Sequence, residues 1–198
     1  MSGQIHRRAF LKVAASFAVL APLPAWAGAA QVPFDPAIPA LGNPRGNVTI
    51  AEFVDYQCPI CKLTYVELKR LIAEDHGIRL VMKDWPIFGD ASRDAARMAL
   101  SAGPHYARAV NALMASGQGL SEHRTNEILA SAGVDVTKVR AGLAARQPKI
   151  DAVLSRNGAQ ASAFGLRGTP ALVIGGTLYR HGMSVADLKL AVAKARAA

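Results

Sequence analysis

The chain has 198 residues, enough for one domain with a hydrophobic core, and a globular composition. Its formal net charge of +9 raises the question of nucleic-acid binding. However, the basic residues are scattered along helical patterns and no nucleic-acid motif is present, so solvated helix faces account for them. Beyond the N-terminus no apolar run is long enough to span a membrane.

The first 27 residues have the pattern of an export signal. Arg7 and Arg8 precede an apolar run over 13–20, and Ala25-Trp26-Ala27 offers a small-x-small cleavage site. The Arg-Arg-x-Phe-Leu-Lys pattern is typical of twin-arginine export, although His6 stands where that pattern prefers Ser or Thr, so Sec export is the alternative. Either route predicts a periplasmic location, where disulfides persist.

Residues 28–46 are rich in proline and glycine and predict an extended lead-in. They show no helical period that would build an oligomerisation stalk, so we expect a monomer.

Residues 48–55 are apolar on both alternating faces, which predicts a central strand covered on both sides. Glu52 is then a carboxylate in an apolar row, and it needs either a partner or a raised pKa. A second apolar run from 78 to 85 predicts the neighbouring strand, which Pro86 ends. Lys83 in that strand is the candidate partner for Glu52, and an exposed lysine at the strand end is the alternative.

Cys58 and Cys61 are the only cysteines, and they lie where the first strand runs into a helix. Pro59 suits the first helical position, so Cys58 is expected to cap the helix and face its free N–H groups and positive dipole end. Both features stabilise a thiolate, while Cys61 lies one turn further in. The pair therefore predicts a redox-active dithiol. A four-thiolate zinc site is excluded, and a structural disulfide is the alternative.

This helix should end near Gly77, and residues 91–147 then read as an alanine-rich set of short helices. Met98 and Met114 fall on their apolar faces, where core packing is favoured over a peptide groove. Asp135 is a candidate cap for a helix carrying Val139 and Leu143. The histidines form no ligand-spaced cluster, and neither a metal nor a cofactor is expected.

Pro148 predicts the start of a further helix, which Gly165 ends. Gly168-Thr169-Pro170 leads into a short β-branched strand, and Gly175-Gly176 predicts a hairpin. The last helix follows a cap at Ser184 and carries three apolar side chains toward the C-terminus: Leu188, Leu190 and Val192.

The order of these elements resembles the disulfide-bond protein A (DsbA) family, an α/β class with a thioredoxin-like fold and an inserted all-helical subdomain. Two motifs carry the resemblance, Glu52 to Lys62 around the cysteines and Gly168-Thr169-Pro170-Ala171. The resemblance implies a thioredoxin-like domain over 47–90 and 148–198, with a helical insertion over 91–147.

The resemblance also implies roles for single residues. Pro170 is expected to form a cis peptide bond with Thr169 close to the cysteines, which leaves the Thr169 backbone free to pair with an extended substrate. Glu52 matches a buried acid beneath the disulfide that assists proton movement, and Lys83 matches its basic neighbour. The implied partners are exported proteins with thiols or disulfides, and a membrane quinone-linked redox protein.

Two departures leave the direction of electron flow open. Ile60 stands where the best-known oxidant of the family has His, and it offers the thiolate no charge, which favours a less oxidising couple. Thr169 before Pro170 is more like the reductase and isomerase relatives, yet the stalk of those relatives is missing. The alternatives are an oxidant, a reductase or isomerase, and a peptide-binding chaperone with a structural disulfide.

Overall fold

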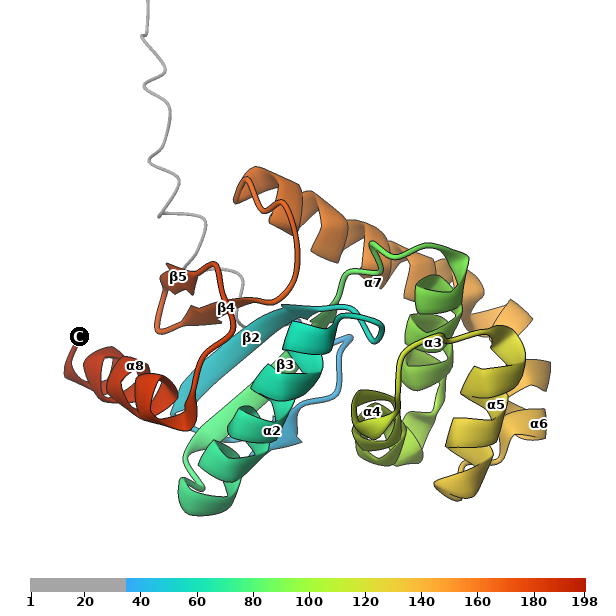
Figure 1. Ribbon diagram of the computed structural model, residues 1–198, viewed down its shortest axis with the longest axis horizontal. Helices are drawn as coiled ribbons and strands as arrows, with labels where there is room; N and C mark the ends of the chain where they lie inside the picture. Colours follow the sequence, from blue (N-terminus) through green and yellow to red (C-terminus); the bar gives the residue numbers. More distant parts are fainter. Residues whose placement is uncertain (1–34) are drawn as a thin grey trace, which may run out of the picture.

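The computed structural model describes residues 35–198, which fold as a five-stranded mixed sheet flanked by helices (Figure 1). The export signal and the first part of the lead-in lie outside these residues. Within the described part, no helix combines the length and the apolar character that crossing a membrane requires. The α/β class expected from the sequence is confirmed.

The sheet has the strand order β1-β3-β2-β4-β5. The central strand β2 (Val48–Val54) pairs in parallel with β3 (Ile78–Asp84) and antiparallel with β4 (Ala171–Ile174). The edges are β1 (Leu41–Gly42), antiparallel to β3, and β5 (Thr177–Tyr179), the second strand of the predicted hairpin. The lead-in therefore contributes an edge strand.

Each face of the sheet carries its own apolar cluster. On one face Ile50, Leu80 and Leu172 pack with Leu68 of α2 (Pro59–Glu74) and Leu188 of α8 (Val185–Ala197). On the other face a smaller cluster joins the sheet to the end of α7 (Leu143–Ala163) and the turn after it: Ala51, Phe53, Ala161, Phe164, Ala171 and Val173. The Phe53 and Phe164 rings meet edge to face with centroids 6.1 Å apart. As predicted, β2 is covered on both sides.

Between β3 and α7 the chain forms only helices, which Figure 1 shows gathered at one side of the sheet. They are α3 (Asp90–Ser101), the 3₁₀ turn η1 (Gly103–His105), α4 (Tyr106–Ala115), α5 (Glu122–Ser131) and α6 (Val136–Ala141). Met98 and Met114 are both buried, as core packing requires.

Three local predictions are corrected. The helix expected to start at Pro148 begins at Leu143, because the helix-favouring residues 143–147 extend it upstream and Pro148 forfeits only one hydrogen bond. Leu143 accordingly belongs to α7 and not to the helix capped by Asp135. α2 ends at Glu74 with Asp75 as its C-cap, before the predicted Gly77. The predicted cap at Ser184 is confirmed, with Asp187 completing a capping box.

Candidate functional site

The two cysteines lie at the N-terminus of α2, as predicted. Cys58 is the N-cap and Pro59 the first helical residue. The Cys61 N–H donates a hydrogen bond to Cys58 Sγ at 3.3 Å, so an orphaned helix donor is directed at this sulfur. Both are free thiols, with Cys58 3% exposed and Cys61 fully buried. The Cys58 sulfur thus lies at the N-terminus of the helix, and the Cys61 sulfur is shielded within the fold.

The Thr169–Pro170 peptide bond is cis, as expected, and it lies against the cysteines. The Cys58 thiol donates a hydrogen bond to the Thr169 carbonyl oxygen at 3.3 Å, although 111 positions separate the two residues. The strand β4 begins directly after Pro170, so the sheet positions this loop beside the helix terminus.

Glu52 points from β2 into the interior beneath the cysteines. Its side chain is fully buried, and neither carboxyl oxygen has a hydrogen-bond partner among the described residues. Burial raises the pKa of Glu52 well above its ordinary value, and negative charge on Cys58 raises it further. Burial likewise raises the pKa of the Cys61 thiol, and the Glu52 carboxylate adds to that rise. The two groups therefore oppose each other's ionisation.

The predicted pair between Glu52 and Lys83 is wrong. β2 and β3 align with Met82 opposite Glu52 and Lys83 opposite Phe53, so the two side chains point to opposite faces of the sheet. Lys83 Nζ instead lies 4.0 Å from Asp35 Oδ2, and Lys83 is only 1% exposed. The lead-in, and not the active-site acid, supplies the countercharge for this buried lysine.

Asp55 is a site residue that the sequence reasoning missed. Its Oδ1 accepts hydrogen bonds from the Gln57 N–H at 2.8 Å and the Ser92 hydroxyl at 2.7 Å, and its Oδ2 accepts from the Ile87 and Phe88 N–H groups at 2.7 and 3.0 Å. This buried carboxylate fixes the 86–89 loop to the turn that precedes the cysteines. A polar residue directly after an apolar strand was the available signal.

Two residues beside the cysteines attach α2 to the helical part. The Gln57 side chain accepts from the Leu120 N–H at 3.0 Å, and the Lys62 ammonium donates to the Leu113 and Ser116 carbonyl oxygens at 2.8 and 3.0 Å. Burial lowers the pKa of Lys62, while Asp55, Cys61 and Cys58 counteract this. The ammonium thus caps the end of α4.

A second buried acid, Asp84, lies at the end of β3 among tyrosines. Burial raises its pKa to about 8; the neighbouring Tyr56 hydroxyl lowers this pKa and Asp55 raises it. The hydroxyls of Tyr56 and Tyr106 are buried too, and burial and Asp84 raise the pKa of both. No sequence pattern singled out Asp84, because the residues that surround it come from other segments and cannot be predicted from the sequence of its own strand.

A groove of about 530 Å³ opens next to the cis-proline, between the start of α2 and the turn before α8. Ile60 and Leu166 are among the residues that line it. Exposed apolar side chains also lie on the first half of α2 and in the 86–89 loop: Ile60, Leu63, Val66, Ile87 and Phe88. This surface is suited to an extended apolar segment of another chain.

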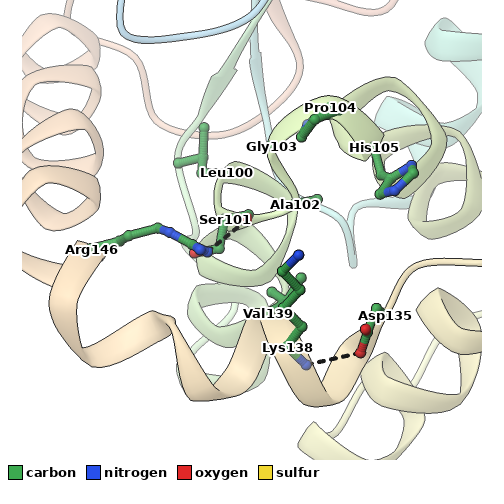
Figure 2. Close-up of a pocket in the computed structure, with 10 residues that line it drawn as sticks. All are labelled: Leu100, Ser101, Ala102, Gly103, Pro104, His105, Asp135, Lys138, Val139 and Arg146. Carbon is green, nitrogen blue, oxygen red and sulfur yellow. Dashed lines mark hydrogen bonds between the residues drawn. The ribbon is translucent and has the colours of Figure 1, made fainter.

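A separate cavity of about 450 Å³ lies at the end of α3, against α6 and the start of α7 (Figure 2). The two hydrogen bonds drawn in Figure 2 connect parts of the fold. Arg146 donates to the Ser101 carbonyl oxygen at 3.0 Å, and the Lys138 N–H donates to Asp135 Oδ1 at 2.9 Å. None of the predicted site residues lines it. In the described part of the chain, no three side chains of the metal-ligating types come together.

Comparison with known proteins agrees with this geometry. The family model described as thioredoxin matches residues 35–194. A thioredoxin-like oxidoreductase from Silicibacter pomeroyi DSS-3 is 36% identical with a TM-score of 0.79, over 83% of this chain and 95% of that one. Among curated proteins, none is similar enough in sequence to match.

Two further solved structures share the architecture. The thiol-disulfide exchange protein α-DsbA2 from Wolbachia pipientis is 25% identical, with a TM-score of 0.79 over 86% of this chain and 95% of that one. The catalytic domain of Proteus mirabilis ScsC is 22% identical, with a TM-score of 0.77 over 88% and 98%, and this likeness concerns the fold alone.

Proposed function

The chain belongs to the thioredoxin family and is an oxidoreductase of the DsbA-like kind, and we propose that it exchanges disulfides with exported proteins through Cys58 and Cys61. The observation that carries this proposal is the placement of Cys58 Sγ. It lies at the N-terminus of α2 and accepts a hydrogen bond from the Cys61 N–H. The Cys58 thiol also donates a hydrogen bond to the carbonyl oxygen of Thr169, which is distant in the sequence. A purely structural disulfide would need neither the helix terminus nor the neighbouring groove.

In the oxidising direction, a substrate thiolate attacks Cys58 Sγ of the Cys58–Cys61 disulfide. The bond between the two cysteines breaks, and Cys61 leaves as a thiolate and takes a proton. A second substrate thiolate then attacks the substrate sulfur of the mixed disulfide, and Cys58 leaves as a thiolate. The substrate loses two electrons and gains a disulfide, and the dithiol holds both electrons. A membrane quinone-linked protein is the proposed acceptor that reoxidises it.

Glu52 is proposed to hold and return the proton of Cys61, because it is the buried acid that interacts electrostatically with both sulfurs. Thr169 is proposed to pair with the substrate backbone, as an added strand would. Lys83 has no proposed part in these steps, because it faces Asp35 on the other side of the sheet.

The test uses the protein without residues 1–27, in its oxidised form, with a reduced unfolded protein as substrate. We expect disulfides to form in the substrate, and Cys58→Ser to abolish the transfer. Full transfer by Cys58→Ser would refute the assignment.

The direction of flow is decided by the reduction potential. Related folds range from about −120 mV for a strong oxidant to about −270 mV for thioredoxin. A glutathione titration that places this pair near the oxidising end supports the oxidant. A potential near the reducing end supports the reductase or isomerase, which Ile60 and Thr169 favour.

Export by the twin-arginine route is proposed from the pattern at Arg7 and Arg8. We expect their joint replacement by lysine to block export, measured by cell fractionation. Normal export of that variant would instead support the Sec route.

A further inference from the structure

The groove beside the cis-proline is basic. Its lining includes Arg167, Arg180 and His181, and no acidic residue is part of it. Its apolar contribution comes mainly from Ile60 and Leu166. A groove lined by both apolar side chains and arginines is complementary to a peptide that carries both apolar and acidic side chains.

The two arginines of the groove differ in what they already bind. Arg180 donates a hydrogen bond to the Phe164 carbonyl oxygen at 2.8 Å, so its guanidinium holds the end of α7 in place. Arg167 is exposed and forms no hydrogen bond or ion pair with any residue in the described range 35–198. Its five N–H donors are therefore available, and the fork of a guanidinium matches a carboxylate.

Arg167 also lies in the same loop as the residue that contacts the reacting sulfur. It precedes Thr169 by two positions, and the Thr169 carbonyl oxygen accepts from the Cys58 thiol. A substrate cysteine joined to Cys58 must pass this loop, so residues next to that cysteine reach the groove. One extended residue spans about 3.3 Å, which places only the nearest neighbours of the cysteine within reach of Arg167.

We propose that this groove selects substrates that carry an acidic residue within three positions of the reactive cysteine, with Arg167 as the recognition residue. The inference rests on the proposed disulfide exchange and adds its substrate class. An exposed ion pair contributes little free energy, so we expect a two- to fivefold preference and not an absolute requirement.

The test compares two synthetic dithiol peptides that differ only in Glu or Gln beside the first cysteine. Each is oxidised to an intramolecular disulfide by the oxidised protein, which becomes the dithiol. We expect the second-order rate constant of this single-turnover oxidation to be about two- to fivefold higher for the Glu peptide than for the Gln peptide. Arg167→Gln should bring the ratio close to one, and Arg167→Lys should restore part of it.

The matched control is Lys194→Gln on α8, which removes the same charge at a position outside the groove and away from both cysteines. The proposal is supported if this variant keeps the wild-type ratio. It is overturned if the two peptides react equally with the wild type, or if Lys194→Gln and Arg167→Gln lower the ratio alike. If neither peptide reacts, the proposed function fails and this inference fails with it.

Discussion

Glu52 and Cys61 are two buried groups that disfavour each other's negative charge. Burial and the nearby carboxylate both raise the pKa of the Cys61 thiol, and burial raises the pKa of Glu52. Because a second anion in this apolar interior is costly, the site favours one negative charge at a time. When Cys61 attacks, a proton passing from Cys61 to Glu52 keeps the number of negative charges on the two groups at one. When Cys61 leaves, the return of that proton does the same.

Glu52→Gln tests this role at the residue scale. The amide keeps the shape of the side chain but cannot exchange a proton, so we expect disulfide exchange to slow by about a hundredfold or more. The rate is measured by quenching the reaction with an alkylating agent at several pH values. An unchanged rate and pH profile would remove Glu52 from the mechanism.

The same variant should be more stable than the wild type at neutral pH. The folded-state pKa of Glu52 lies above its ordinary value of 4.5, so the folded state holds a proton that the unfolded state has released. The wild type therefore loses stability as pH rises from about 4.5 toward the folded pKa, and glutamine removes this loss. If Glu52→Gln exchanges disulfides more slowly than the wild type but unfolds at a higher denaturant concentration, its loss of activity is not due to structural damage.

Asp84 allows a second test, with a defined pH window. Its pKa is raised from 3.8 to about 8. Since the folded state retains the proton across this range, the free energy of unfolding should fall with rising pH by up to about 1.4 kcal/mol per unit, and level off above the window. Asp84→Asn should show a smaller slope in urea titrations at pH 5 to 9, because the contribution of Glu52 remains. An equal slope in both proteins would contradict the assignment.

At the scale of elements, α2 is held from two directions. The sheet and α8 pack against its buried face, and α4 accepts the Lys62 ammonium at its C-terminal carbonyl oxygens. The Tyr65 hydroxyl adds a bond to Asn111 Oδ1 at 2.9 Å. These contacts join α4 to the helix that carries the cysteines.

Lys62→Met should therefore weaken this junction. The variant keeps most of the apolar stem but leaves the end of α4 without its cation, and we expect a loss of about 1.5–3 kcal/mol in unfolding free energy, as for hydrogen bonds from a charged donor. The measurement is urea denaturation. The control is Lys69→Met, because Lys69 is exposed on the same helix and makes no hydrogen bond or ion pair within residues 35–198. Equal losses in both variants would show that Lys62 does not hold the junction.

At the scale of the whole molecule, the sequence predicted the features that depend on local chemistry. Pro59 marked the helix start and thereby the cap position of Cys58, and Gly175-Gly176 marked the hairpin turn. The cis bond before Pro170 and its closeness to Cys58 came from the family resemblance. These predictions succeeded because each rests on a local backbone requirement: proline fixes φ, and glycine readily adopts the positive φ found at Gly175 and Gly176.

The features that the sequence did not predict depend on alignment between distant segments. The Glu52–Lys83 pair failed because the register of two parallel strands decides which side chains share a face. Asp55, Gln57 and Lys62 were missed because their partners come from loops and helix ends elsewhere in the chain. The start of α7 was misplaced because a proline inside a helix costs less than a helix-favouring stretch and its packing provide.

The proposed disulfide exchange depends most on Cys58 being the sulfur that bonds to substrate, with Cys61 releasing it. The direct measurement is to incubate Cys61→Ser with thiol or disulfide substrates, separate disulfide-linked adducts without reductant, and locate the linkage by mass spectrometry. We predict stable adducts joined at Cys58, absent from the Cys58→Ser protein. If Cys61→Ser accumulates no adduct while Cys58→Ser retains exchange activity and forms adducts through Cys61, the assigned roles are contradicted.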